Sequence, residues 1–136
     1  MVKPICRDVM FLKRKSLPAT EKDKKIIEDL IDTLKHHNNE CVGMAANMIG
    51  ENKRIIIAHL GFFDEIMVNP VIVEKEEPYE TKESCLSLVG FREVTRYNRI
   101  KVEYLNKEFE QKVIDLQGFS AQIVQHECDH LEGIII

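Results

Sequence analysis

Apolar residues recur at helical spacing in two stretches, one in each half of the chain. In the first stretch they fall at Ile26, Ile27, Leu30, Ile31 and Leu34. Thr20 followed by Asp23 resembles a capping arrangement ahead of them. This pattern predicts an amphipathic helix that begins after Thr20 and continues to the polar residues 36–39. In the second stretch, Gly118 opens a helix that we expect to end near Leu131.

Between these helices, β-branched and alternating apolar runs predict strands. Residues 54–60 form one strand, and residues 66–73 form a second that we expect to be bulged or bent at the pair 69–70, which is Asn-Pro. The segment 74–82 is acidic and contains Pro78. Its composition predicts a loop or an edge segment.

The remaining apolar runs predict a meander with a turn at residues 106–107. These runs are 91–95, 100–105 and 109–114. The chain is therefore predicted to be one α+β domain over residues 1–136. It has an N-terminal helix, antiparallel β-sheets and a C-terminal helix packed against them.

Composition narrows the class of protein. The 136 residues are 44% hydrophobic and 31% charged, which is ordinary for a globular domain. No segment approaches the roughly 18 apolar residues of a membrane span, and no export signal is visible, so we expect a cytoplasmic protein without a membrane partner. The net charge of -4 argues against a direct nucleic-acid site.

The C-terminal helix carries the candidate chemistry. His126 and His130 bracket Glu127 in the pattern H-E-x-x-H, which is a metal signature. On a helix the two imidazoles project from one face about one turn apart, with Glu127 beside them. Cys128 falls on the opposite side, where we expect a core thiol or one that supports the ligands. The alternative is that both histidines are simply exposed to solvent. A candidate third ligand upstream in the sequence disfavours this alternative.

A catalytic metal site usually has three protein ligands and one open position. No histidine follows His130 in this sequence, so the third ligand is expected upstream. Cys85 is the preferred candidate, because a thiolate binds first-row divalent ions strongly and polar neighbours can order its loop. Cys41 competes with it. The alternative for either residue is a buried thiol with a purely structural role.

Three motifs in order make the sequence similar to the peptide deformylase family. The glycine-alanine motif G-φ-G-φ-A-A-x-Q, where φ is apolar, corresponds to residues 41–48. The motif E-G-C-L-S corresponds to 83–87, and Q-H-E-x-D-H is complete in 125–130. The resemblance spans nearly the whole chain. It implies removal of the formyl group from the N-terminal formyl-methionine of new polypeptides.

The resemblance also implies a role for each matching residue. Cys85, His126 and His130 would hold one divalent ion, expected to be Fe²⁺ in the cell, with Zn²⁺, Ni²⁺ or Co²⁺ also suited. Glu127 would act as general base and acid for a metal-bound water, and the backbone N–H of Leu86 would donate to the developing oxyanion. By position relative to the motifs, the methionine pocket would be formed by Val42, Gly43, Leu88, Phe119, Ile123 and His126.

Three residues depart from the family pattern. Cys41 and Ser84 replace glycines, and Met48 stands where the family has an oxyanion-donating glutamine. The adjacent Asn47 has a donor amide that could take over this role. The departures keep two alternatives open, namely a metallo-amidohydrolase of another small N-acyl amide and a low-activity metal-binding homologue. The expected partners are formyl-methionyl peptides or nascent chains, with action near the ribosome.

Overall fold

The computed structural model describes residues 1–134 and confirms the α+β class. All strands belong to one five-stranded antiparallel sheet, in which the spatial order follows the chain order. The elements are α1 (Val9–Leu12), the 3-10 turn η1 (Glu21–Asp23), α2 (Lys24–His36), β1 (Gly43–Ala45), the 3-10 turn η2 (Ala46–Ile49), β2 (Ile55–His59), β3 (Asp64–Glu83), β4 (Arg92–Leu105), β5 (Gln111–Gln117) and α3 (Gly118–Leu131). Within residues 1–134, no helix is long and apolar enough to cross a membrane.

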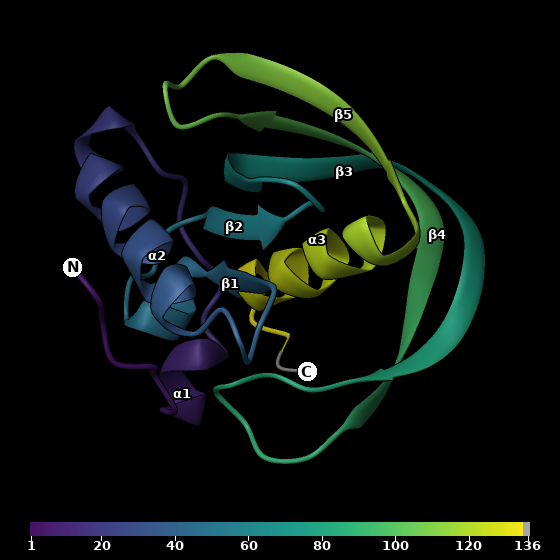
Figure 1. Ribbon diagram of the computed structural model, residues 1–136, viewed down its shortest axis with the longest axis horizontal. Helices are drawn as coiled ribbons and strands as arrows, with labels where there is room; N and C mark the ends of the chain where they lie inside the picture. Colours follow the sequence, from purple (N-terminus) through teal and green to yellow (C-terminus); the bar gives the residue numbers. More distant parts are fainter. Residues whose placement is uncertain (135–136) are drawn as a thin grey trace.

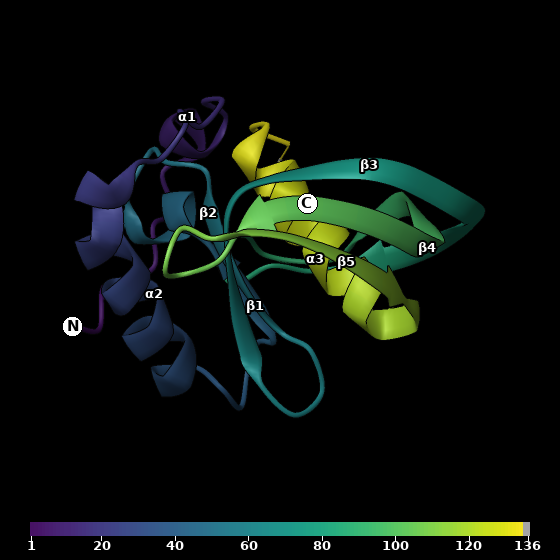
Figure 2. The same ribbon diagram turned by 90° about the horizontal axis from the view of Figure 1, so that it is seen from above.

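The sheet bends around its C-terminal helix. In Figure 1, β3, β4 and β5 curve past one side of α3, while β1, β2 and α2 lie on the other side. Figure 2 shows the same division from above. The helix α3 contacts β1, β2 and β4, so it is enclosed by the sheet that precedes it. The core between these elements includes the fully buried residues Ile55, Ile56, Ile57, Met67, Val68, Val102 and Val124.

The capping signal at Thr20 begins the 3-10 turn η1, which leads directly into α2 at Lys24. The Thr20 backbone N–H donates to Asp23 Oδ2 at 2.8 Å, and the Lys22 N–H donates to the Thr20 hydroxyl at 3.3 Å. These bonds satisfy donors that a helix start would otherwise leave free. The apolar face of α2 is buried against the sheet, as its periodicity predicts.

The segment 74–82 was predicted to be a loop or an edge segment, and it is an edge: it forms the second half of β3, whereas β2 pairs with β3 only over residues 64–68. It pairs with β4 as far as Glu83. Residues 74–78 are exposed, so the segment lacks the alternation that marks a half-buried strand. Its conformation depends on cross-strand pairing instead. In the same way, β4 runs unbroken from Arg92 to Leu105, although only residues 91–95 and 100–105 were predicted as strand.

The predicted bulge at residues 69–70 is confirmed. The register between β3 and β4 shifts between Val68 and Val71, and Asn69 has a φ of 50°. Asn69 Oδ1 accepts from the Ala19 N–H at 2.8 Å, and Asn69 Nδ2 donates to the Ala19 carbonyl at 3.0 Å. The amide side chain thus ties the bulge to the segment that leads into α2.

A side chain of α3 extends the sheet beyond the end of β5. The last pair between β4 and β5 joins Arg99 to Gln117. Two residues earlier, the Tyr97 N–H donates to Gln125 Oε1 and Gln125 Nε2 donates to the Tyr97 carbonyl, both at 2.8 Å. The backbone N–H and carbonyl of Tyr97 both bond to Gln125, so they point away from β3. Tyr97 and the opposite residue Pro78 therefore form a non-hydrogen-bonded pair of the antiparallel ladder. The missing N–H of Pro78 therefore leaves no ladder bond unmade.

We predict that Gln125→Leu lowers the free energy of unfolding by about 1–3 kcal/mol, since it leaves two strand groups without partners. Urea unfolding measures this change. The matched control is Gln111→Leu, because Gln111 is exposed on β5 and its substitution should change stability by less than about 0.5 kcal/mol. Equal stability of the two variants would contradict the role of Gln125.

Candidate metal centre

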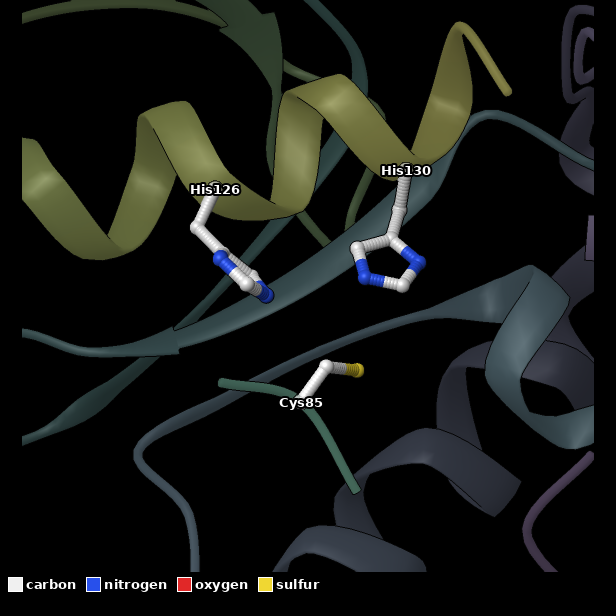
Figure 3. Close-up of side chains that lie close together, drawn as sticks. All are labelled: Cys85, His126 and His130. Atoms are coloured by element: carbon white, nitrogen blue, oxygen red, sulfur yellow. The ribbon is translucent and has the colours of Figure 1, made fainter. Parts of the chain in front are cut away.

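Cys85, His126 and His130 converge on one point. Their ligand atoms all lie within 4.8 Å of one another. The two imidazoles hang from consecutive turns of α3, with ring centroids 5.2 Å apart, and Cys85 approaches from the loop after β3 (Figure 3). One thiol and two imidazoles form a donor set that suits first-row divalent ions. Of the two cysteines considered from the sequence, only Cys85 belongs to this group.

His130 has the state that a metal ligand needs. It is 1% exposed, and neither ring nitrogen has a hydrogen-bond partner among the described residues. Burial, together with the nearby His126, lowers the pKa of His130 to about 3. The imidazole is therefore neutral at pH 7 and keeps a free lone pair. A bound cation would satisfy a buried polar group that is otherwise without a partner.

His126 is oriented by a buried carboxylate. Its Nδ1 donates to Glu83 Oε1 at 2.7 Å, which leaves Nε2 for the group formed with Cys85. Burial works against a charge on His126, but hydrogen bonds with Cys85 and Glu83 outweigh it and raise its pKa to about 10. The surroundings thus favour positive charge at this ring. A metal ion would supply that charge in place of the proton, so the residues fit a cation.

Glu83 joins three elements at this site. Arg96 donates to its two oxygens at 2.9 and 2.7 Å, and Gln122 Nε2 donates to Oε2 at 2.9 Å. Burial alone would raise the pKa of Glu83. The hydrogen bonds from His126, Arg96 and Gln122 outweigh this effect and lower the pKa to about 2. Arg96 also pairs with Asp129 on α3 at 2.8 Å. The carboxylate is therefore charged and fixes the ring of His126.

Sequence reasoning missed Arg96 and Gln122. Neither lies in a motif considered above, and Arg96 is on β4, a strand whose middle was not predicted. The signal available in the sequence was Glu83, which lies two residues before the candidate ligand Cys85. A carboxylate that is buried beside such a site needs a cationic partner.

Glu127 lies against β1. It is 4% exposed, and burial raises its pKa to about 7. A Cβ added at Gly43 would lie 2.8 Å from Ile123 Cγ2 and 3.0 Å from Glu127 Oε2. Gly43 therefore has no side chain because α3 and Glu127 approach its backbone too closely to admit one.

A cavity of about 530 Å³ opens from this group to the surface. All the residues expected from the sequence to form the methionine pocket line it, namely Val42, Gly43, Leu88, Phe119, Ile123 and His126. Leu86 and Glu127 also line it, as does Cys41. Five lining residues were not anticipated: Glu40, Lys82, Gly90, Phe91 and Gln122.

The two residues considered for the oxyanion position differ in their contacts. Met48 is 2% exposed and lines the cavity, and its Sδ accepts from the Ala45 N–H at 3.4 Å. Asn47 Nδ2 donates to the His130 backbone carbonyl at 2.8 Å. Asn47 does not belong to the cavity lining. This contact anchors α3 beside His130 and leaves the expectation that Asn47 replaces the missing donor without support.

Cys41 and Cys128 have surroundings that favour the neutral thiol. Burial raises the pKa of Cys41 to about 12, and burial does the same for Cys128. Cys128 packs against the core, as its place on the helix predicts. A thiol with so high a pKa is a poor metal ligand at neutral pH.

Comparison with known proteins follows this geometry. The sequence profile described as Polypeptide deformylase matches residues 3–136. A peptide deformylase of Clostridium beijerinckii is 55% identical over 136 residues, which is 100% of both chains. A peptide deformylase of Desulfitobacterium hafniense is 38% identical over 128 residues, which is 91% of this chain and 84% of the relative.

Solved structures agree with the sequence comparison. The crystal structure of peptide deformylase from Thermotoga maritima has a TM-score of 0.89 at 34% identity, over 99% of this chain and 95% of that chain. The actinonin-bound class I type b peptide deformylase from Acinetobacter baumannii has a TM-score of 0.87 at 33% identity, over 99% of this chain and 95% of that chain.

We predict that Cys85→Ala lowers the bound divalent metal well below one ion per chain, because it removes one of three ligands. Elemental analysis of dialysed protein measures the metal content. Cys128→Ala and Cys6→Ala are the matched controls and should stay near one ion per chain. Retained metal in Cys85→Ala, together with loss in Cys41→Ala, would transfer the ligand role to Cys41.

Proposed function

Since the chain belongs to the polypeptide deformylase family, we propose that it hydrolyses the formyl amide of N-terminal formyl-methionine on nascent polypeptides. The observation that supports this most directly is the convergence of Cys85, His126 and His130 near the buried Glu127, with Cys85, His126 and Glu127 lining one cavity. Action near the ribosome belongs to the same proposal, because nascent chains would be the source of the substrate.

Cys85, His126 and His130 would hold one divalent ion, which we propose is Fe²⁺ in the cell. When bound, such an ion acts as a Lewis acid and lowers the pKa of a coordinated water from 15.7 to about 7. The thiol and imidazole donors accept Zn²⁺, Ni²⁺ and Co²⁺ as well, so metal supply in the cell contributes to the choice. The hydrogen bond from His126 Nδ1 to Glu83 would leave Nε2 as the nitrogen that holds the ion.

Glu127 would move the proton. Its pKa of about 7, raised chiefly by burial, lets the carboxyl group both accept and release a proton near neutral pH. It would take the proton of the attacking water and pass it to the amine that leaves. Gly43 allows β1 to lie directly against this carboxylate, which fixes its position for both steps.

The cavity would hold the rest of the substrate. The methionine side chain would lie among the apolar lining residues, with Ile123 and Met48 buried at the floor. The backbone N–H of Leu86, next to Cys85, would donate to the carbonyl oxygen as it gains negative charge. The amidohydrolase alternative would need a different acyl group in this cavity, and no observation favours it.

Formate release from a formyl-Met-Ala-Ser peptide tests the proposed function. The chain should release formate when loaded anaerobically with Fe²⁺, and comparison with the Zn²⁺ form measures the effect of the metal. We predict that Glu127→Gln lowers kcat by about 100-fold or more while the metal stays bound, because an amide cannot take up the proton. Glu28→Gln, an exposed substitution on α2, is the control. Unchanged turnover in Glu127→Gln would remove Glu127 from this role.

We predict that Met48→Gln raises kcat by about 10-fold or more and changes the KM much less. A thioether cannot donate a hydrogen bond, and loss of one preorganised donor typically lowers turnover by about 100- to 1000-fold. A donor that acts mainly in the transition state changes kcat. The control is Met48→Leu, which has a similar size and no donor. Equal kcat in the Gln and Leu variants would mean that no donor is missing at this position.

A further inference from the structure

The residues that line the cavity are buried at its floor and exposed at its mouth, where several of them are apolar. At the floor, His126 and Glu127 are 8% and 4% exposed. At the mouth, Val42, Phe91 and Phe119 are 38%, 74% and 63% exposed, and all three line the same cavity. We call these three residues the apolar rim. A peptide whose formyl group lies at the floor must leave the cavity across this rim.

The apolar rim is assembled from three separate segments. Val42 precedes β1, Phe119 lies in the first turn of α3, and Phe91 follows the loop that carries Cys85. Gly90, with a φ of 87°, turns the chain immediately before Phe91. A side chain is strained at such a φ, so the glycine permits the turn that brings Phe91 to the cavity. Single exposed apolar residues are common, but two phenylalanines at the mouth of one cavity form a binding surface.

Charge gives this mouth little selectivity. Glu40 and Lys82 also line it, and both are exposed. Their charges are opposite and screened by solvent, so they favour neither an acidic nor a basic peptide. Apolar contact is the remaining source of preference at the mouth.

We propose that Phe91 and Phe119 bind the side chain of the residue that follows formyl-methionine, and so select peptides with a large apolar or aromatic second residue. This inference rests on the proposed function and extends it beyond the first residue. The binding free energy from contact with an aromatic ring corresponds to about a 3- to 10-fold gain in kcat/KM. The gain should appear in KM, because the second residue lies away from the reacting amide.

The test uses the metal-loaded enzyme and formyl-Met-X-Ser peptides in which X is Phe, Leu, Ala, Asp or Lys. We expect kcat/KM for Phe and Leu to exceed that for Ala by about 3- to 10-fold, with Asp and Lys no better than Ala. Phe91→Ser should bring the ratio of kcat/KM for Phe to that for Ala close to one, because it removes one of the two aromatic contacts that favour Phe. Phe119→Ser should lower the rates on all five peptides, because Phe119 also borders the methionine pocket.

Val89→Ser is the matched control. Val89 is 94% exposed in the same loop but does not line the cavity, so its variant should keep the full preference. Equal rates for Phe and Ala in the wild type would overturn the inference and leave the proposed function standing, as would an unchanged preference in Phe91→Ser. A preference that appears only when X is moved to the third position would also overturn it. If no peptide in the series releases formate, the proposed function fails, and this inference fails with it.

Discussion

The carboxylate of Glu83 accepts hydrogen bonds from Arg96 on β4 and from Gln122 and His126 on α3, while its own backbone ends β3. A buried charge of this kind is stable only when it is paired and fully hydrogen-bonded, and loss of one partner typically destabilises a protein by about 3–5 kcal/mol. The arrangement of β3, β4 and α3 therefore depends on this one group. Cys85, two residues beyond Glu83, is brought opposite His126 by the same constraint, so the fold and the metal centre share a single support.

The sequence was most informative where local chemistry decides the structure. The cap at Thr20, the helix α3 from Gly118 to Leu131, and the bulge at residues 69–70 were all predicted, because each depends on neighbours in the chain. The second half of β3 was predicted as a loop or an edge segment, so its place at an edge was anticipated but its length as a continuous strand was not. Residues 74–78 are exposed on both faces, so no hydrophobic pattern marks this part of the strand, and its conformation depends on pairing with β4. Local propensity is a weak guide where tertiary pairing determines the conformation.

In the candidate site, too, some residues could be predicted from the sequence and others could not. Two ligands and Glu127 were found together because one helix carries all three, and helical geometry fixes their relative positions. Cys85 was favoured by its chemistry and its loop, and the fold brings it to the histidines. The residues that hold the ligands in place were harder to find. Arg96 and Gln122 act on the site through Glu83, and contacts between side chains from different strands and helices leave no spacing pattern in a single sequence.

The departures from the family motifs follow a physical rule. Gly43, whose Cβ would press on Glu127, is kept, whereas the glycine two residues earlier is replaced by Cys41. Cys41 lines the cavity but does not belong to the Cys85, His126 and His130 group. Met48 likewise changes the cavity wall and leaves the ligand set intact. Ser84, the third departure, directly precedes Cys85 and also lines the cavity, so all three departures lie on the cavity wall. Gly43 differs from these three positions, because an added Cβ there would lie 2.8 Å from Ile123 Cγ2 and 3.0 Å from Glu127 Oε2, so even one methyl group would displace the carboxylate that we propose moves the proton.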